Sequence, residues 1–253
     1  MPTSDQKKIE ARFDRESLAW REIYRRSDRN PFAYHDKLYR KRYVLDLLGR
    51  GSGRVLDLGC GAGEFFHELK LAGFSVTGAD FSAEMVRLAA QAGDGRNPVV
   101  RADAVRLPFC SGAYRGLIGV GLLEYLPEDE TLLAEILRVM EPGGTVVITL
   151  RNARCLERRL WKFYTRRGWM KPEAIGFYRE HNLKDFQSLV ARIGFTGFEY
   201  RFCHFYPIPW PLSKIGGKVN NFLAHFCERI FSRSRISWLG STIICRFQAP
   251  DRK

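Results

Sequence analysis

Three carboxylates and a run of glycines form the pattern in this 253-residue chain with the clearest chemical meaning. Asp57 lies near the end of an apolar run and is followed by glycines at every second position: Gly59, Gly61 and Gly63. Glycine permits tight turns and lets the backbone approach a ligand closely. Asp80 ends the next apolar run, and Asp103 follows a third one. Because a carboxylate in such a place can accept hydrogen bonds from both hydroxyls of a ribose, the pattern predicts a nucleoside-binding site.

Each part of this pattern also has a purely structural interpretation. The glycines could form an ordinary strand-to-helix turn, and Asp80 could cap the helix that follows. The loop matches neither G-x-G-x-x-G nor a phosphate loop ending in Lys-Ser/Thr, which disfavours a nicotinamide-dependent enzyme, the nearest rival. The turn formed by Glu141, Pro142, Gly143 and Gly144 disfavours that rival further. The succession of all parts in one series favours a ligand site.

The elements that must position these residues alternate along the chain. Apolar runs predict strands near residues 54–58, 75–79, 98–102, 116–120 and 144–150. Helical periodicity predicts helices near residues 5–26, 34–48, 64–72, 83–92 and 128–140. Such alternation predicts a parallel sheet with helices on both faces, whose ligands bind at the carboxyl ends of the strands. A helix within residues 181–194 and two closing strands, near residues 197–205 and 241–248, are expected to complete the fold.

At these residues the chain resembles the class I S-adenosylmethionine (SAM)-dependent methyltransferases, over about residues 45–150. The resemblance implies an α/β fold with a Rossmann-like, doubly wound, mostly parallel seven-stranded sheet whose last strand is antiparallel. It implies SAM as the cofactor, with its methionine part at the glycine loop, its ribose at Asp80 and its adenine at Asp103. The implied cofactor-binding residues are Asp57, Gly59, Cys60, Gly61, Gly63, Asp80, Phe81, Asp103, Ala104 and Val120.

One integrated domain is expected, in three parts. Residues 1–50 form a helical N-terminal cap, residues 51–150 the SAM-binding core, and residues 151–253 a lid, the closing strands and a basic amphipathic insertion. The six cysteines form neither a C-x-x-C pair nor a Cys/His cluster, which disfavours metal sites and disulfides and suits a reducing cytoplasm. The polar N-terminus is unlike a signal peptide, and no apolar run is long enough to span a membrane.

Positive charge is concentrated in the last part of the chain. Residues 151–253 hold 20 Lys and Arg against 7 Asp and Glu, whereas residues 51–150 hold 8 against 13. Two basic stretches with helical spacing of aromatic residues, 151–167 and 212–231, predict either contact with an anionic membrane or helices whose apolar sides pack on the core. We expect a cytoplasmic protein with a peripheral membrane contact. Nucleic acid is a weaker alternative, because large aliphatic residues interrupt the basic stretches.

Candidates for the catalytic step are Tyr125, His181 and Glu124. Tyr125 stands where the family often has histidine, which makes a base at that position doubtful. His181 opens the helix expected after the lid, where either a base or a packing residue is possible. The sequence as a whole predicts methyl transfer from SAM to a small or lipid-like acceptor. An RNA methyltransferase and a SAM-binding protein without catalytic activity are the alternatives.

Overall fold

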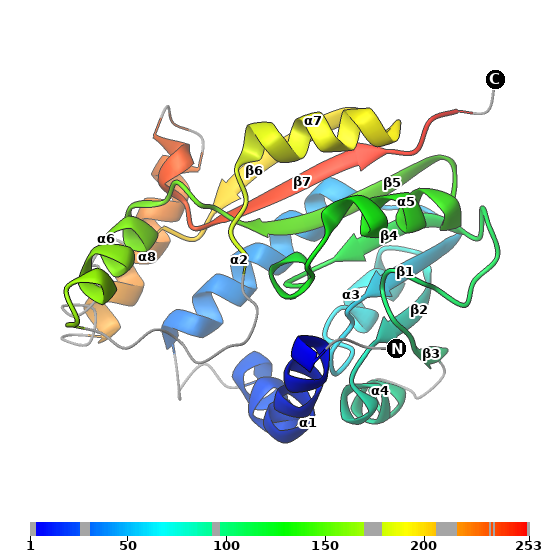
Figure 1. Ribbon diagram of the computed structural model, residues 1–253, viewed down its shortest axis with the longest axis horizontal. Helices are drawn as coiled ribbons and strands as arrows, with labels where there is room; N and C mark the ends of the chain where they lie inside the picture. Colours follow the sequence, from blue (N-terminus) through cyan, green and yellow to red (C-terminus); the bar gives the residue numbers. More distant parts are fainter. Residues whose placement is uncertain are drawn as a thin grey trace.

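The computed structural model describes residues 4–25, 31–92, 97–169, 179–205, 217–232, 234 and 236–251. Its centre is a seven-stranded sheet in the order β3-β2-β1-β4-β5-β7-β6 (Figure 1). The strands are β1 (Arg54–Leu58), β2 (Ser75–Asp80), β3 (Val99–Arg101), β4 (Tyr114–Gly119), β5 (Met140–Arg151), β6 (Thr196–Cys203) and β7 (Thr242–Gln248). The first five strands in this order, β3, β2, β1, β4 and β5, pair in parallel with one another. β7 is antiparallel to both of its neighbours, β5 and β6. The predicted Rossmann-like fold with an antiparallel last strand is confirmed.

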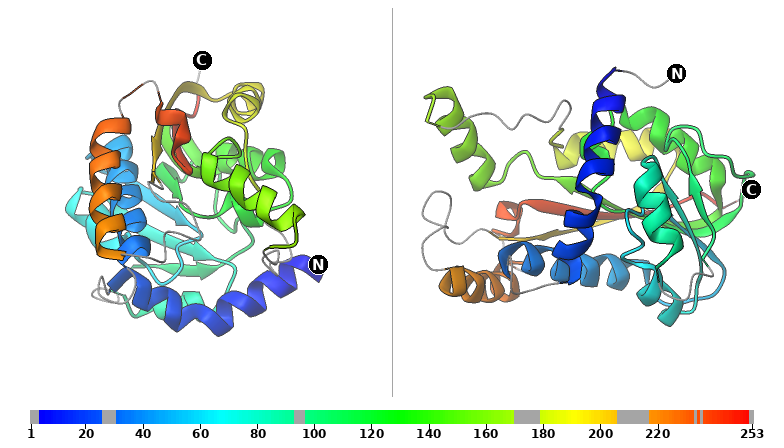
Figure 2. Two further views of the ribbon diagram at one scale, coloured as in Figure 1. Left: turned by 90° about the vertical axis from the view of Figure 1, so that its left-hand side faces the viewer. Right: turned by 90° about the horizontal axis from the view of Figure 1, so that it is seen from below.

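Helices cover both faces of the sheet (Figures 1 and 2). They are α1 (Ser4–Arg25), α2 (Pro31–Leu48), α3 (Phe66–Leu71), α4 (Ala83–Ala90), α5 (Asp129–Val139), α6 (Leu156–Arg166), α7 (Leu183–Ile193) and α8 (Gly217–Phe231), with short 3₁₀ turns at Leu123–Tyr125 and Ser237–Leu239. Apolar side chains of α5 and α7 form one core with the sheet, and those of α2 and α3 form a second core. None of the helices in these ranges combines the length and apolar character needed to cross a membrane.

Among the described residues, the start that differs most from its prediction is that of β5. β5 starts at Met140 instead of residue 144, because Met140 already pairs with Tyr114 before an irregularity in the register. The turn at Gly143, whose φ is +66°, is therefore enclosed within the strand. The helix expected over residues 212–231 is observed from Gly217, and residues 212–216 lie outside the described part of the chain.

Candidate active site

A cavity of about 450 Å³ lies at the carboxyl ends of the parallel strands. From β1 the chain adds β2 and β3 on one side of the sheet and then β4 and β5 on the other side, so the strand order reverses between β1 and β4. Ligands bind at such a point in open α/β sheets. Nine of the ten residues predicted to contact a cofactor line this cavity: Asp57, Gly59, Cys60, Gly61, Asp80, Phe81, Asp103, Ala104 and Val120. The fold therefore brings together residues from four separate strand ends.

The glycine loop leaves open space at the position that faces the cavity. Gly61 has a φ of +52°, and a Cβ atom built on it would meet nothing within 4 Å. Gly63, in contrast, is not among the residues that line the cavity. A Cβ atom on Gly63 would lie 2.9 Å from Cβ of Ala92, so this glycine permits close packing of the helices. Burial raises the pKa of the Cys60 thiol, which keeps it protonated and unsuited to act as a nucleophile.

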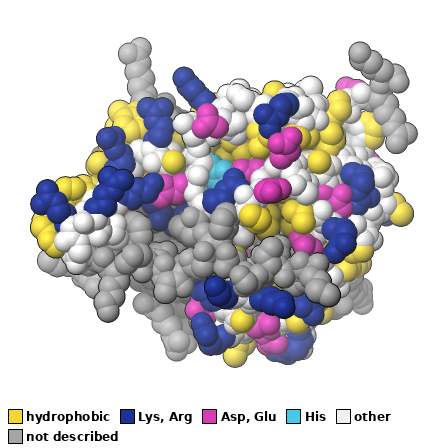
Figure 3. Space-filling view, in the orientation of Figure 1, with side chains coloured by type: hydrophobic (Ala, Val, Ile, Leu, Met, Phe, Trp, Pro, Cys, Tyr) yellow, Lys and Arg dark blue, Asp and Glu magenta, His cyan; other side chains and the backbone are white. Residues whose placement is uncertain are grey.

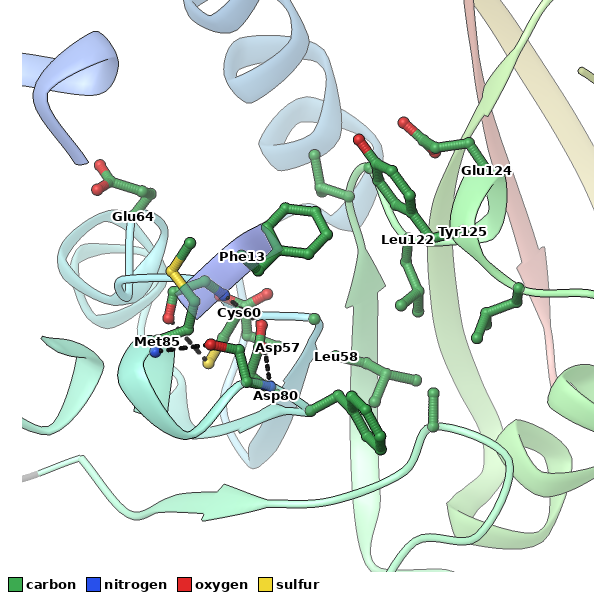
Figure 4. Close-up of a pocket in the computed structure, with 18 of the residues that line it drawn as sticks. Phe13, Asp57, Leu58, Cys60, Glu64, Asp80, Met85, Leu122, Glu124 and Tyr125 are labelled. Carbon is green, nitrogen blue, oxygen red and sulfur yellow. Dashed lines mark hydrogen bonds between the residues drawn. The ribbon is translucent and has the colours of Figure 1, made fainter. Parts of the chain in front are cut away.

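Asp80 holds the loop in place with its carboxylate. Its Oδ2 accepts a hydrogen bond from the Gly61 N–H, and its Oδ1 accepts one from the Ser82 N–H, each at 2.9 Å (Figure 4). An ionised carboxylate has about four acceptor positions, so two remain for hydroxyls of a ligand. Burial raises the pKa of Asp80, while these backbone hydrogen bonds lower it. Asp103 also lines the cavity, and its Oδ1 accepts a hydrogen bond from the Val105 N–H.

Asp57 is a buried carboxyl group with one oxygen atom that accepts no hydrogen bond from the described residues. It is 1% exposed, and its Oδ2 has no hydrogen-bond partner among the described residues. Burial, followed by the neighbouring Asp80, raises its pKa to about 8, although Lys41 opposes the shift. Buried acceptors are nearly always satisfied in native proteins. Together with the open space at Gly61, this oxygen fits a ligand that brings a cationic hydrogen-bond donor to the loop.

The N-terminal helix α1 closes the cavity from the side. Ile9, Glu10 and Phe13 line it, and the Phe13 ring points toward Tyr125, with ring centroids 5.1 Å apart (Figure 4). Asp14 fixes α1 to the start of α4, because its Oδ1 accepts from the Ser82 hydroxyl and from the Glu84 N–H. Sequence reasoning expected a cap here but did not identify Asp14, whose role depends on a contact 68 positions along the chain.

Two of the three catalytic candidates lie in the cavity wall. Glu124 is buried and lines the cavity. Its Oε1 and Nη1 of Arg40 both lie beside Gly121, each 3.8 Å from the position that a Cβ atom on this glycine would take. Tyr125 is half-buried, and burial followed by the charge of Glu124 raises its pKa to about 12. At neutral pH its hydroxyl therefore stays protonated, so it can donate a hydrogen bond but does not act as a base.

His181, the third catalytic candidate, is not among the residues that line this cavity. Its Nε2 is 3.2 Å from Oδ2 of Asp129, which also forms an ion pair with Arg179. The side chain is buried and packs edge-on against Phe186. His181 helps to hold the segment after α6 against α5, which is a structural role. Among the described residues, the histidine that lines the cavity is His204.

The other half of the cavity is basic. It is lined by Lys37 and Arg40 from α2, Arg151 from the end of β5 and Arg158 from α6, with Ser241 and Thr242 at the start of β7. The sequence left open whether residues 151–167 contact a membrane or pack on the core, and the structure shows that Arg158 is only 9% exposed and lines the cavity. The signal that could have identified Lys37 and Arg40 is their i, i+3 spacing, which places both on one face of the helix.

Several known proteins resemble this chain in sequence or in fold. The family model described as "Methyltransferase domain" matches residues 56–148. A demethylmenaquinone methyltransferase of Thermus thermophilus is 36% identical over 119 residues, which cover 45% of this chain and 54% of that protein. A phosphatidylethanolamine N-methyltransferase of Cereibacter sphaeroides is 34% identical over 151 residues, which cover 54% of this chain and 71% of that protein. The chain spans about half the length of the Thermus thermophilus protein and of two further demethylmenaquinone methyltransferases that it matches.

A solved structure extends the similarity in fold to nearly the whole chain. Phosphoethanolamine N-methyltransferase 2 of Haemonchus contortus, in complex with SAM, has a TM-score of 0.66 at 16% identity, covering 99% of this chain and 61% of that chain. The fold, the strand-end carboxylates and the curated relatives lead to one conclusion. This chain belongs to the class I SAM-dependent methyltransferase family.

Proposed function

We propose that the protein transfers a methyl group from SAM to a small or lipid-like acceptor. The observation that supports this most strongly is that one cavity contains the glycine loop and the strand-end carboxylates together with a part lined by lysine and arginine side chains. The cofactor and the acceptor could therefore bind side by side. The names of the curated relatives support the acceptor class, since one acts on demethylmenaquinone and another on phosphatidylethanolamine. Both acceptors are small or lipid-like molecules.

In this proposal the protein mainly binds, orients and excludes water. When bound, SAM supplies a methyl group that its positively charged sulfur makes electrophilic. Asp80 accepts hydrogen bonds from the ribose, Asp103 from the adenine amino group, and Asp57 from the ammonium of the methionine part. Phe13 and Leu122 help to keep water from the cavity, and holding two reactants together supplies much of the acceleration. The protonated Tyr125 hydroxyl is placed to orient an acceptor.

Replacing Asp80 with alanine tests the cofactor site. Loss of the ribose hydrogen bonds to a charged acceptor should weaken SAM binding by about 1.5–3 kcal/mol, and calorimetry measures this change. Asp46→Ala removes a half-exposed carboxylate of α2 outside the cavity and should leave the dissociation constant unchanged. Circular dichroism verifies that both variants fold. Equal affinity of Asp80→Ala and the wild type would remove Asp80 from the ribose role.

We also propose that α6 and α8 hold the protein on an anionic membrane surface. Both helices lie at the same end of the molecule in Figures 1 and 2. On α8 the side chains of Phe222, Phe226 and Ile230 form an exposed apolar stripe, with Phe222 70% exposed. α8 packs on α2 instead through its opposite side, which buries Ala224 and Glu228. This stripe therefore does not belong to the core, and it suits insertion between lipids.

The end of the molecule that carries α6 adds both apolar and basic side chains. Phe163 and Trp169 are exposed there, Trp169 by 63%, beside the exposed Arg159, Arg166 and Arg167. In Figure 3, Lys and Arg side chains gather at the left end, where Figure 1 draws α6, next to exposed hydrophobic ones. Basic residues near an anionic surface contribute about 1 kcal/mol each.

Vesicle co-sedimentation tests the membrane proposal. Arg159→Glu, Arg166→Glu and Arg167→Glu combined should reduce binding to anionic vesicles by more than about 100-fold, because the loss of three attractive charges costs about 3 kcal/mol and three repulsive charges are added. Phe222→Ser with Phe226→Ser should reduce it as well. A control with the same net charge reverses three exposed arginines elsewhere: Arg42, Arg87 and Arg192. Equal loss in that control, or salt-sensitive binding of the wild type to RNA but not to vesicles, would contradict a membrane role.

A further inference from the structure

We propose that the Glu124 carboxylate receives a protonated amine, so that the methyl acceptor is an amine. This inference rests on the proposed methyl transfer and names the acceptor class. Glu124 is buried and lines the cavity, and among the described residues its carboxylate takes part in no hydrogen bond or ion pair. Buried polar groups nearly always have a hydrogen-bond partner in native proteins. A carboxylate of this kind in a ligand cavity indicates a ligand that supplies the donors.

The other carboxylates that line the cavity already have a role. Those with a hydrogen bond or another interaction within the protein are Glu10, Glu64, Asp80 and Asp103. Asp57 has one oxygen that accepts no hydrogen bond, and the proposed function assigns this oxygen to the ammonium group of the cofactor. Glu124 therefore remains for the acceptor, and each of the two reactants has one carboxylate that awaits a donor.

The net charge of the cavity favours a cationic acceptor. Among the described residues, six carboxylate side chains and four Lys or Arg side chains line it, which leaves two negative charges when all are ionised. The four cations, Lys37, Arg40, Arg151 and Arg158, each have an interaction within the protein, so they are not reserved for an anionic ligand. SAM carries one net positive charge, and one negative charge remains when it is bound. A protonated amine balances that charge.

Glu124 stands next to the part of the cavity that is assigned to the methionine end of SAM. β1 pairs with β4, which brings the segment after β4 beside the glycine loop. There Cδ1 of Leu122 lies 3.2 Å from the position that a Cβ atom on Gly59 would take. Oε1 of Glu124 lies 3.8 Å from the corresponding position on Gly121, so the absent side chain of this glycine leaves room beside the carboxylate. An amine held by Glu124 is therefore close to the cofactor's methyl group.

Two aromatic rings complete the surroundings of this carboxylate. Phe13 and Tyr125 both line the cavity, with ring centroids 5.1 Å apart. In Figure 4 the Tyr125 hydroxyl and the Glu124 carboxylate are directed the same way. After burial, the charge of Glu124 is the largest cause that raises the pKa of Tyr125, so the two groups are near each other. An ammonium group suits this place, because the carboxylate and the electron-rich ring faces both attract a cation.

Glu124 also accepts the proton that an ammonium group must lose before it reacts. One proton passes from the ammonium to the carboxylate, which leaves a neutral amine with a lone pair. This lone pair forms the new N–C bond to the methyl group while the S–C bond breaks and its electrons stay on sulfur. The products are a methylated ammonium and S-adenosylhomocysteine, and Glu124 then releases its proton to solvent.

The experiment titrates amine probes into protein saturated with S-adenosylhomocysteine, in phosphate buffer because Tris is itself an amine. By calorimetry, the wild type should bind ethanolamine at least tenfold more tightly than N-acetylethanolamine, which lacks the positive charge. Glu124→Gln keeps the shape of the side chain but removes its charge, and should weaken ethanolamine binding tenfold or more. Glu130→Gln removes an exposed carboxylate outside the cavity and should bind ethanolamine like the wild type.

A second arm distinguishes a soluble amine from a lipid headgroup. Dihexanoyl phosphatidylethanolamine, kept below its micellar concentration, carries the same ammonium group with acyl chains, and its N-acetylated form is the neutral-headgroup control. Tighter binding of this lipid than of ethanolamine supports a lipid source. Equal or weaker binding supports a soluble amine.

The outcomes separate this inference from the proposed function. S-adenosylhomocysteine binding by Glu124→Gln shows that the variant folds. If the wild type binds no S-adenosylhomocysteine, the proposed methyl transfer fails. If it binds S-adenosylhomocysteine but neither amine probe, or if Glu124→Gln binds the amines as the wild type does, the amine site is wrong. Equal binding of the amines and their N-acetylated forms would likewise overturn the assignment of Glu124.

Discussion

Gly61→Val is expected to abolish SAM binding, with affinity lowered more than 100-fold, while the protein remains folded. The glycine faces open space in the cavity, so the added side chain meets no protein atom but occupies volume that the cofactor requires. The positive φ of +52° makes valine strained at this position, and such strain costs about 1–3 kcal/mol. Calorimetry with SAM and a thermal unfolding curve measure the two effects separately.

Gly49→Val is the matched control for that variant. Gly49 also has a positive φ, +82°, and a Cβ atom on it would meet nothing within 4 Å. It lies at the end of α2 and does not line the cavity. The control should show a similar loss of thermal stability with unchanged SAM affinity. Retained binding in Gly61→Val, or equal loss of binding in Gly49→Val, would show that the loop is only a turn.

Asp57→Asn is expected to stabilise the ligand-free protein and to weaken SAM binding. The folded protein keeps a proton on Asp57 at neutral pH, because its pKa is raised to about 8, whereas the unfolded chain releases that proton above about pH 4. The folded state therefore binds more protons, and this residue lowers stability as pH rises from about 4 to 8, by at most about 1.4 kcal/mol per pH unit. Asparagine removes this dependence.

Thermal unfolding at pH 5 and pH 8 measures the effect of Asp57→Asn. The variant should gain stability over the wild type, and the gain should be larger at pH 8. SAM affinity should fall about tenfold or more, because the ammonium loses a charged acceptor. At pH 7 the wild type should also release a proton when SAM binds, which calorimetry in buffers of different ionisation enthalpy detects. A gain that is independent of pH would show that Asp57 is ionised in the folded protein.

The cofactor half of the site could be predicted because its signals are local. An apolar run that ends in a carboxylate identifies a strand and its carboxyl end together, as at Asp80. Parallel pairing then brings these ends to one edge of the sheet, and the observed registers of β1, β2 and β3 confirm that arrangement. The doubly wound sheet of seven strands with an antiparallel last strand, in contrast, was an expectation from the family resemblance, and the order of the strands came only from the structure, since periodicity does not determine which strands are neighbours.

The acceptor half could not be predicted because it depends on which face of a helix turns inward. The periodicity of residues 212–231 showed an apolar side, but α8 buries Ala224 and Glu228 against α2 and leaves Phe222 exposed. Similarly, charge alone did not distinguish Arg158, which turns into the cavity, from its exposed neighbour Arg159. In both helices tertiary contacts decide the orientation, and a pattern along one segment does not contain them.

Calorimetric titration of the purified wild-type protein with SAM tests the central claim most directly. The account predicts binding at one site per chain, competition by S-adenosylhomocysteine, and loss of both in Gly61→Val but not in Gly49→Val. These results would place the cofactor at the glycine loop and strand-end carboxylates. No heat of binding for SAM or S-adenosylhomocysteine with the folded wild-type protein would contradict the account.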